Sequence, residues 1–318
     1  MGADVTIAVV SWNTRDLLKR CLRSMEPEVT AGRAEVWVVD NGSTDGSPEL
    51  AEEQFAWAEL VRAERNLGFG PAVNRVASTT SAPWIAPANA DIELAPGALE
   101  RLLATGGSDI STGSVAPRLV LTEGGTQHSV HSFPAPLLGA TVNLGLHHVV
   151  PGLGERLCLE GFWNPDRPRR VPWAHGAFLL VRRAAWDAAG GFDEDQWMYA
   201  EDIDLAWRLR RAGFHTAYEP RAHVRHAVSA ATLKAFGPDR ERRHLSAAYA
   251  WLERRRGRAA ALAYGAFNIG GALARWILAT PPALLGSETA RSRRSLARHY
   301  VSVHRAGLAA RAGGGEAG

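Results

Sequence analysis

Cysteine is scarce in this chain of 318 residues, which holds only Cys21 and Cys158, far apart in the sequence. They give neither a disulfide framework nor a cysteine-based metal site, and they fit a reducing compartment. With 32 Gly and 17 Pro the chain is not collagen-like or linker-dominated, and 46% hydrophobic residues exclude a wholly disordered chain. No basic and then apolar leader precedes the first strand-like stretch, so we expect no secretion. The length suits one large α/β domain with an appendage, or two modest domains.

The net charge of +3 hides an asymmetry along the chain. Residues 1–233 contain 21 Lys+Arg and 28 Asp+Glu, a net charge of −7, whereas residues 234–318 contain 15 and 5, a net charge of +10. In a nucleic-acid-binding protein the basic face should belong to the fold itself, so we expect no nucleic-acid partner. The pattern favours a catalytic body with a basic tail drawn to an anionic surface.

Strand-like and helix-like segments alternate in the first part of the chain. Short apolar runs predict strands at Val5–Val10, Glu35–Val39, Leu60–Val61 and Trp84–Ala88. Helical spacing predicts a first helix through Leu17 and Met25, capped by Asn13 or Thr14, and further helices at Pro48–Phe55 and Pro71–Ser78. The alternation predicts the α/β fold class, with a doubly wound, mainly parallel sheet and helices on both faces. Its ligand crevice should lie at the carboxyl ends of the strands.

The later segments are less regular. We expect strands at Ser114–Leu121 and Ala177–Val181 and helices at Ala184–Ala189 and Asp202–Ala212. Residues 124–172 show no clear period, which is typical of an acceptor-binding or lid region. Beyond Ala230 the pattern becomes Arg-rich and helical. The sequence therefore predicts a catalytic domain over residues 1–232 and a basic, partly apolar helical extension over residues 233–318.

Polar clusters follow three of these segments. The Asp40 carboxylate, at the end of the second strand, could accept the imide N–H of a uracil or thymine; alternatively it only forms the turn with Asn41 and Gly42. The oxygens of Asn89 and Asp91 suit Mg²⁺ or Mn²⁺ together with nucleotide phosphates, although Asp91 could equally cap a helix.

The third cluster is Met198–Asp204, just before a helix. Acidic residues in a first helical turn offset the helix dipole, and this explains at least one of them. Asp204 can pair with Arg208 at i,i+4, which leaves Glu201 and Asp202 as candidates for a general base. His226 lies downstream; a lone histidine is usually structural, but near a metal-bound diphosphate it would suit an extra ligand.

The order of the motifs is more specific than any one of them. Together they resemble the inverting family-2 glycosyltransferases of the GT-A fold, and most closely their rhamnosyltransferase-like branch. The resemblance extends over Val5–Ser229 and is carried by WNTRDLLKRCLRSM, VVDNGSTDGS, NLGFGPAVN, NAD, GAFLLVRRAAWDAAGGFDE and MYAEDIDLAWRLRRAGF.

This resemblance implies roles for the matching positions. The nucleotide-binding residues would be Trp12, Asn13, Asp40, Asn66, Gly68 and Asn89. The pocket for donor and acceptor would include Trp173, Gly176 and Ala177. Asp202 would be the catalytic base, beside Glu201. The metal ligands would be Asp91, His226 and Asn89, where Asn89 replaces the first Asp of the family's DxD motif.

The implied reaction is a single in-line displacement. A base removes the acceptor proton while Mg²⁺ or Mn²⁺ neutralises the departing diphosphate, so no protein nucleophile is needed. The resemblance implies a dTDP- or UDP-sugar donor, with rhamnose as the first expectation. It also implies a glycan or lipid-linked acceptor in cell-surface polysaccharide or glycoconjugate synthesis.

The extension carries an uncharged segment, Ala259–Ala274, which is shorter than the roughly 20 apolar residues that span a bilayer. Arginines flank it, which favours an interfacial helix and a cytoplasmic protein at the inner face of the plasma membrane. A helix packed on the catalytic body, or on a second subunit in a homodimer, explains the pattern equally well.

Three other functions are consistent with parts of the sequence. A sugar-nucleotide pyrophosphorylase should have a Gly-rich basic loop after the first strand, where this chain has Ser11–Thr14. A nicotinamide dehydrogenase needs G-x-G-x-x-G there, and Gly68–Gly70 comes too late. A non-catalytic carbohydrate-binding protein remains the alternative from another class, favoured by Asn89 and opposed by the acidic residues Asp91, Glu201 and Asp202.

Overall fold

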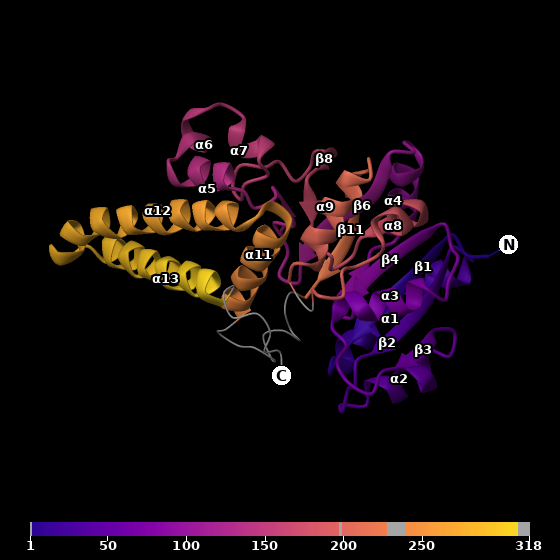
Figure 1. The fold of residues 1–318 in the computed structure, drawn as a ribbon. Helices are drawn as coiled ribbons and strands as arrows, with labels where there is room; N and C mark the ends of the chain where they lie inside the picture. Colours follow the sequence, from indigo (N-terminus) through magenta and orange to yellow (C-terminus); the bar gives the residue numbers. More distant parts are fainter. Residues whose placement is uncertain (1, 197–198, 228–239, 311–318) are drawn as a thin grey trace. The chain divides into compact units, whose positions relative to one another are not determined.

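The computed structural model describes residues 2–196, 199–227 and 240–310 (Figure 1). The chain divides into two compact units. The first consists of Met1–His131 and Glu160–Ala235, and the second of Ser132–Leu159 and Phe236–Gly318. From the sequence we expected a single boundary near residue 232. In the structure Ser132–Leu159 also belongs to the unit that contains the C-terminal helices.

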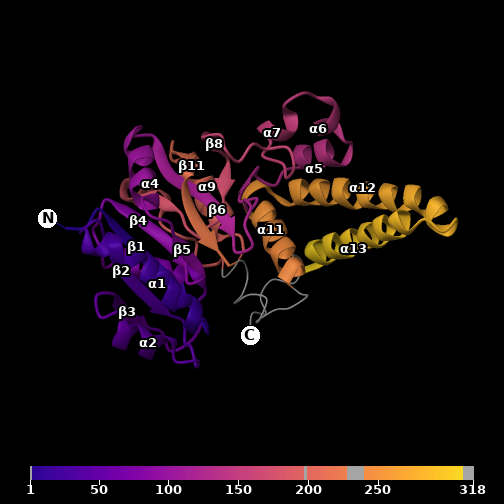
Figure 2. The ribbon, with the colours of Figure 1, turned by 180° about the vertical axis from the view of Figure 1, so that it is seen from behind.

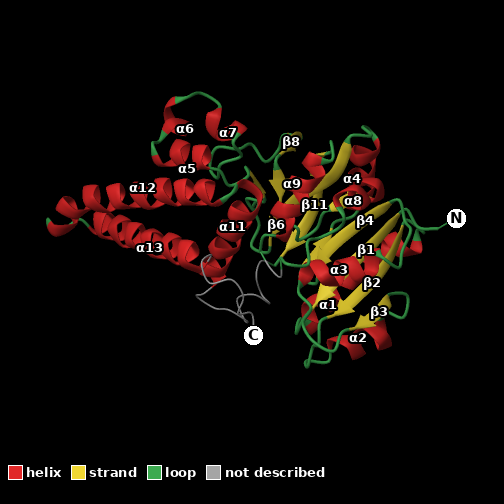
Figure 3. Cartoon of the chain, viewed as in Figure 1, coloured by secondary structure: helices red, strands yellow, loops and turns green. Residues whose placement is uncertain are grey.

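The first half of unit 1 is a parallel sheet built on the apolar strand β1 (Val5–Ser11). Its neighbours β2 (Ala34–Asp40), β3 (Glu59–Arg62) and β4 (Trp84–Asn89) lie in the order β3-β2-β1-β4, all parallel. Figure 3 shows these strands in yellow. The predicted doubly wound, mainly parallel α/β sheet is confirmed.

Three helices connect these strands: α1 (Arg15–Thr30), α2 (Ser47–Gln54) and α3 (Phe69–Ala77), of which Figure 2 shows α1 from behind. The helix α1 buries Leu18, Leu22 and Met25 completely against the sheet core. Burying each such side chain contributes about 2 kcal/mol. Because the chain moves along the sheet in one direction through α1 and α2 and returns through α3, right-handed crossovers place α3 on the opposite face.

The start of α1 differs from the predicted capping. Thr14 is the N-cap residue, but its hydroxyl contacts Ser11 Oγ at 3.0 Å and caps no helical N–H. Instead, the Asp45 carboxylate accepts the backbone N–H of Arg15 at 2.9 Å. A side chain from the turn after β2 therefore caps the helix, which fixes that turn against the end of β1.

The second half of the sheet mixes directions. β10 (Leu180–Arg182) is antiparallel to both β4 and β6 (Thr112–Leu121), and β11 (His215–His226) is parallel to β6. β5 (Ile92–Leu94) and β8 (Arg169–Val171) both pair antiparallel with β11. The sequence analysis did not predict β11.

Shorter elements complete unit 1. These are the helices α4 (Ala98–Gly107), α8 (Arg183–Ala189) and α9 (Glu201–Arg211), and a two-stranded sheet of β7 (Val130–His131) and β9 (Trp173–Ala174).

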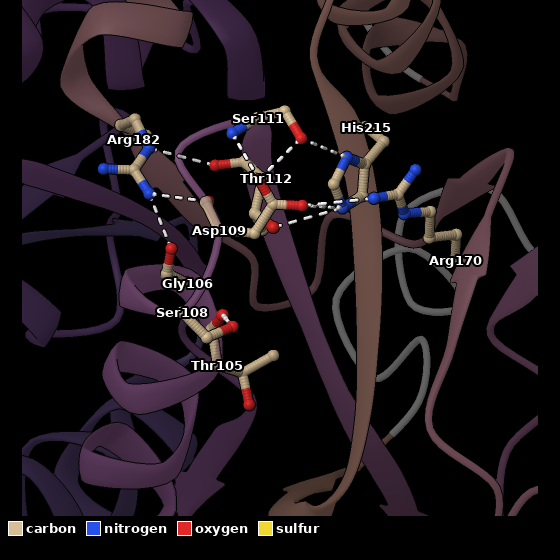
Figure 4. A network of polar contacts seen from close by, with 9 residues as sticks. All are labelled: Thr105, Gly106, Ser108, Asp109, Ser111, Thr112, Arg170, Arg182 and His215. Carbon is tan, nitrogen blue, oxygen red and sulfur yellow. Dashed lines mark hydrogen bonds and ion pairs between the residues drawn. The ribbon is translucent and has the colours of Figure 1, made fainter.

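A polar network closes the amino-terminal edge of this sheet, opposite the carboxyl edge (Figure 4). The Arg182 guanidinium donates to the carbonyls of Gly106, Asp109 and Thr112 and lies 4.5 Å from the ring centroid of Trp84. His215 contacts Ser111 and Thr112, and burial lowers its pKa. Since its groups satisfy one another, we interpret this network as structural.

Unit 2 is helical. Its elements are α5 (Pro136–Asn143), α6 (Leu146–Val149), α7 (Leu153–Arg156), α11 (Arg240–Arg256), α12 (Arg258–Leu284) and α13 (Glu288–Ala310). The Asn143 amide donates to the Asn268 side chain, and a Cβ atom at Gly271 would lie 2.1 Å from Asn143 Oδ1. This close approach explains why the segment before α7 folds with the C-terminal helices. Within the described residues no helix combines the length and the apolar character needed to cross a membrane.

Candidate active site

The carboxyl ends of β1, β2 and β4 bring the first predicted site residues to one edge of the sheet. Asp40 pairs in register with Ser11, and Asn89 pairs with the adjacent residue Val10. Because neighbouring strands lie about 4.8 Å apart, Asp40 and Asn89 are separated by roughly 10 Å across β1. A nucleoside diphosphate is long enough to reach both residues.

Asp40 is 3% exposed, and its two carboxylate oxygens have different surroundings. Oδ2 accepts the backbone N–H groups of Gly42 at 3.2 Å and Ser43 at 2.9 Å. Oδ1 is buried and has no hydrogen-bond partner among the described residues. An unsatisfied buried carboxylate oxygen is costly, so Oδ1 is suited to receive an N–H donor from a ligand.

Trp12 and Asn13 lie beside Asp40 at the end of β1, and both are half-buried. Asn13 has a left-handed backbone, with φ of 52°, a conformation that Asn adopts more readily than most residues. Its backbone N–H donates to Ser43 Oγ at 2.9 Å, and its Oδ1 accepts the N–H of Thr44 at 2.8 Å. These bonds hold the turn after Asp40, and leave the role of Asn13 toward a ligand as a prediction.

The loop at Asn66–Gly68 is tied to the same turn. Asn66 Oδ1 accepts the backbone N–H of Gly68 at 2.9 Å and the Asn41 amide at 3.3 Å. The Asn41 amide also donates to the Gly68 carbonyl at 3.1 Å. Gly68 has φ of 87°, which favours glycine at this position. The structure therefore places Asn66 and Gly68 next to the Asp40 turn.

Two hydrogen bonds connect Asn74 of α3 to Phe192, in the segment between α8 and α9. The Asn74 side chain donates to the carbonyl of Phe192 and accepts its N–H, both at 2.9 Å. A Cβ atom at Gly191 would lie 2.7 Å from Asn74 Oδ1, which only glycine avoids at this φ of 67°. The glycine pair before Phe192 therefore permits this close contact.

Gly176 and Ala177 connect β4 to the start of α9. The backbone N–H of Asn89 donates to the Ala177 carbonyl at 2.9 Å. The backbone N–H of Gly176 donates to Asp202 Oδ2 at 3.1 Å, and a Cβ atom at Gly176 would lie 3.4 Å from the Asp202 Cβ atom. Asn89, Gly176, Ala177 and Asp202 are thus joined by two hydrogen bonds at one edge of the sheet.

Burial raises the pKa of Asp202 to about 6, against the opposing hydrogen bonds from the N–H groups of Gly176 and Ile203. Burial, together with the charge of Asp202, raises the pKa of Glu201 to about 8. Of the two carboxyl groups, Glu201 therefore keeps its proton to the higher pH and Asp202 ionises first. An ionised carboxylate with a raised pKa is suited to remove a proton from a hydroxyl group.

Asp204, the third acid of this cluster, is fully buried and pairs with Arg208 at 2.7 Å. The predicted i,i+4 ion pair is confirmed. Arg208 also donates to the carbonyl of Ala189, which ties α9 to α8. Asp204 therefore holds the helix in place and leaves the other two acids as candidates for proton transfer.

The pairing of β11 with β5 brings His226 to Asp91. His226 is opposite Ile92 in the register, and the N–H of Ala227 donates to the Asp91 carbonyl at 2.9 Å. His226 Nε2 lies 3.3 Å from Asp91 Oδ1, and the two side chains are 9% and 8% exposed. His226 Nδ1 contacts Gln127 Oε1 at 2.8 Å. With Nδ1 donating to Gln127, a neutral ring turns its Nε2 lone pair toward the carboxylate, and a protonated ring forms an ion pair with it.

This pair fits a divalent cation. Two such atoms this close together need a proton or a cation between them, and Asp91 Oδ1 has no hydrogen-bond partner among the described residues. No group of three or more His, Cys, Asp or Glu side chains in the described residues could hold a metal ion. An ion held by Asp91 and His226 would therefore complete its shell with phosphate oxygens, water and the Asn89 amide, as Mg²⁺ commonly does.

The sequence analysis missed the residues that surround this pair. The Gln127 amide also contacts His175 Nδ1 at 3.4 Å, and His175 Nε2 lies 3.0 Å from His131 Nε2. The predicted pocket residue Trp173 is buried and stacks on His131, with ring centroids 4.6 Å apart. Gln127, His131 and His175 were visible in the sequence, but no period indicated that they would meet.

Two family models match the chain: "Glycosyl transferase family 2" over residues 6–143 and "Glycosyltransferase like family 2" over residues 164–245. The chain belongs to glycosyltransferase family 2 and is rhamnosyltransferase-like. It is 32% identical over 235 residues to N-acetylglucosaminyl-diphospho-decaprenol L-rhamnosyltransferase of Mycobacterium tuberculosis, covering 69% of this chain and 75% of the relative.

Two further similarities agree with this family. Rhamnosyltransferase WbbL of Escherichia coli is 37% identical over 86 residues, which cover 27% of this chain and 32% of WbbL. The mannosyltransferase PcManGT of Pyrobaculum calidifontis, solved with GDP-mannose and Mn²⁺, superposes with a TM-score of 0.59 at 19% identity, covering 97% of this chain and 88% of that structure. The latter likeness establishes the GT-A type of fold.

Proposed function

We propose that this glycosyltransferase moves L-rhamnose from dTDP-rhamnose to a hydroxyl group of a lipid-linked sugar, with inversion at the anomeric carbon. The observation that carries the proposal is the meeting of Asp202, Gly176 and Asn89 at the sheet edge that also ends in Asp40. The nucleobase, the diphosphate and the reacting sugar of the donor would then all bind along this one edge of the sheet.

The nucleotide would be held by the turn after β2. Asp40 Oδ1, which lacks a partner among the described residues, would accept the imide N–H of a thymine or uracil ring. Cytosine carries no imide N–H, so this oxygen favours the other two pyrimidines. Asn66 and Gly68, fixed beside that turn, would line the base or ribose.

Proton transfer would fall to Asp202. Its Oδ2 is held by Gly176 and its Oδ1 by Ile203, so the carboxylate is oriented before a substrate arrives. A catalytic base that is already oriented speeds the reaction, because less entropy is lost in reaching the reactive geometry. Glu201, which has the higher pKa of the pair, would adjust the local charge and leave the proton transfer to Asp202.

Asp91 and His226 would hold Mg²⁺ or Mn²⁺, and Asn89 would contribute a neutral oxygen. The bound ion would offset the negative charge that gathers on the departing diphosphate. Since Asn89 replaces a carboxylate, the protein contributes one negative charge less, and the donor's own phosphates carry more of the binding. The acceptor is proposed from the printed name of the mycobacterial relative, whose substrate is a sugar on a decaprenyl diphosphate.

A panel of donors tests the proposal. Nucleotide release is measured with dTDP-rhamnose, UDP-glucose, UDP-N-acetylglucosamine and GDP-mannose, each with Mg²⁺ or Mn²⁺ and an N-acetylglucosaminyl-diphospho-lipid acceptor. We expect release that requires the acceptor and is fastest with dTDP-rhamnose. Faster transfer from a purine nucleotide sugar would overturn the donor assignment. Binding of donors without transfer or hydrolysis would favour the non-catalytic alternative.

A further inference from the structure

The hairpin of α12 and α13 in unit 2 has features that the transfer reaction does not use. The two helices run antiparallel: a Cβ atom at Gly265 would lie 2.5 Å from Leu308, and at the other end Arg291 Nε donates to the Ala283 carbonyl at 3.3 Å. The connecting turn contains Leu285 and Gly286. Figure 1 shows this turn at the end of the hairpin.

The end of α12 and the residue after it expose large apolar side chains. Leu285 is 88% exposed, Leu278 and Leu284 are each 75% exposed, and Ile277 is 60% exposed. These four residues, which we name the apolar tip, occupy the last two turns of α12 and the residue after it. Single exposed leucines are ordinary, but a cluster at one end of a helix indicates a surface that becomes covered.

Arginines surround a groove next to the apolar tip. A hollow of about 390 Å³ is lined by Arg291, Arg294 and Arg298 of α13 and by Leu273 and Trp276 of α12. The Arg294 guanidinium lies 5.2 Å from the Trp276 ring centroid, and its Nε atom is buried without a hydrogen-bond partner among the described residues. We name this hollow the arginine groove.

The charge of the hairpin is strongly one-sided. Residues 258–310 contain seven arginines and a single acid, Glu288. No ion pair joins Arg291, Arg294 or Arg298 to a carboxylate within the described residues. A guanidinium fork binds phosphate well, and exposed apolar residues flanked by arginines are typical of elements that enter the headgroup region of a bilayer.

We infer that the apolar tip and the arginine groove form a docking site for an anionic phospholipid bilayer. The leucines insert into the boundary between headgroups and acyl chains, and the groove holds a phosphodiester headgroup between Arg291 and Arg298. Charge complementarity favours this occupant over a protein partner, whose covered surface is usually poorer in unpaired charge of one sign. This inference rests on the proposed function, because a lipid-linked acceptor requires the enzyme to work at a membrane.

Vesicle binding of the full chain tests the inference. Flotation is compared for vesicles of phosphatidylcholine alone and of phosphatidylcholine with phosphatidylglycerol, at low and high salt. We expect binding only with phosphatidylglycerol, weakened at high salt because surface charge is screened. The double variant Arg291→Gln/Arg298→Gln should lower the partition coefficient about 25-fold, since each arginine near the surface contributes about fivefold.

Matched variants distinguish the effect of the proposed docking site from the effect of changing charge or hydrophobicity elsewhere on the surface. Arg23→Gln/Arg101→Gln removes the same charge from exposed positions of unit 1, and Ile110→Glu changes a side chain that is 79% exposed there. Both should bind vesicles like the wild type, whereas Leu284→Glu/Leu285→Glu should lose at least about tenfold in partition. Equal losses in the two sets would overturn the inference.

Three other outcomes would also overturn it. These are absence of vesicle binding, stabilisation by inorganic phosphate through the groove without vesicle binding, and concentration-dependent dimers that Leu284→Glu/Leu285→Glu dissociates. Donor hydrolysis in the absence of membranes is measured on the same variants. Retained hydrolysis with lost vesicle binding leaves the proposed function intact, so the two proposals can fail separately.

Discussion

The backbone N–H of Gly176 donates to Oδ2 of Asp202 at 3.1 Å, although 26 residues separate them. The same segment accepts the N–H of Asn89 through the Ala177 carbonyl. The carboxylate is therefore fixed to the backbone that ends at the predicted metal site. Its position therefore depends on a distant part of the chain as well as on its own helix, and this makes it open to test.

Replacing Asp202 by Asn keeps the shape of the side chain but removes its ability to take a proton. We expect kcat to fall by at least about 10³-fold, while the Kd for dTDP changes little. Steady-state transfer and calorimetric titration of dTDP measure the two quantities. Glu201→Gln is the matched control, because the Gln amide resembles the protonated acid, and its kcat should stay within a few-fold. A kcat like that of the wild type in the Asp202 variant would exclude it as the base.

The raised pKa of Asp202, about 6, predicts the pH profile. The base must be ionised, so kcat/KM should rise with pH and level off above about pH 6. The Glu201→Gln variant should keep this acidic limb, since its neighbour still titrates. A profile that is flat down to pH 5 would contradict the assignment.

The same pair predicts how stability depends on pH. Folding raises both pKa values, so the folded state binds protons more tightly than the unfolded state. Stability from this pair is complete below the unfolded values and is lost as the pH rises through about 6 to 8. Glu201→Gln should therefore raise the melting temperature at pH 8.5 more than at pH 5. An equal shift at the two pH values would argue against a buried, protonated Glu201.

Gln127 fixes the orientation of His226, so its loss should weaken cation binding. Gln127→Leu should raise the Kd for Mn²⁺ in the presence of dTDP by about 10- to 100-fold, the usual effect of losing a hydrogen bond to a metal-binding histidine. Gln127→Glu keeps an acceptor for His226 Nδ1 and should lose less. The free Mn²⁺ signal in electron paramagnetic resonance measures this without turnover. Unchanged Mn²⁺ affinity in the Leu variant would show that Gln127 does not orient the pair.

Asp40→Asn should weaken binding of the nucleotide. The amide oxygen is a poorer acceptor than a carboxylate, and we expect the Kd for dTDP to rise about tenfold or more, as for loss of a hydrogen bond to a charged group. Asp109→Asn, at the opposite edge of the sheet, is the control and should leave this Kd unchanged. If both variants bind dTDP equally well, Asp40 does not contact the base.

Arg182 tests the structural network at the opposite edge. Arg182→Leu leaves three carbonyls without their donor and removes the contact with Trp84. We therefore expect the free energy of unfolding to fall by about 2–4 kcal/mol. Arg182→Lys keeps the charge but loses the several N–H donors of the guanidinium group. Its free energy of unfolding should lie between those of the wild type and the Leu variant. Chemical denaturation measures the change, and dTDP binding of the folded variants should not change. A shift below half a kcal/mol in the Leu variant would contradict the role of the network.

Local patterns in the sequence determined the first half of the fold. The buried run at Val5–Ser11 and the helical spacing of Leu18, Leu22 and Met25 are each recorded within a few neighbouring residues, so periodicity could predict them. The sequence also predicted the pair Asp204–Arg208, because its partners are one helical turn apart. The order of the motifs gave the family, which the family models confirm.

Tertiary structure alone decided the rest. Strand β11 contains Pro220 and a bulge, so its pattern was too irregular to predict, yet it delivers His226 to Asp91 by pairing with β5. The contact of Gly176 with Asp202, the role of Gln127 and the packing of Asn143 on Gly271 all join residues distant in the sequence. Such contacts depend on how whole strands and helices are placed, and no local period records that placement.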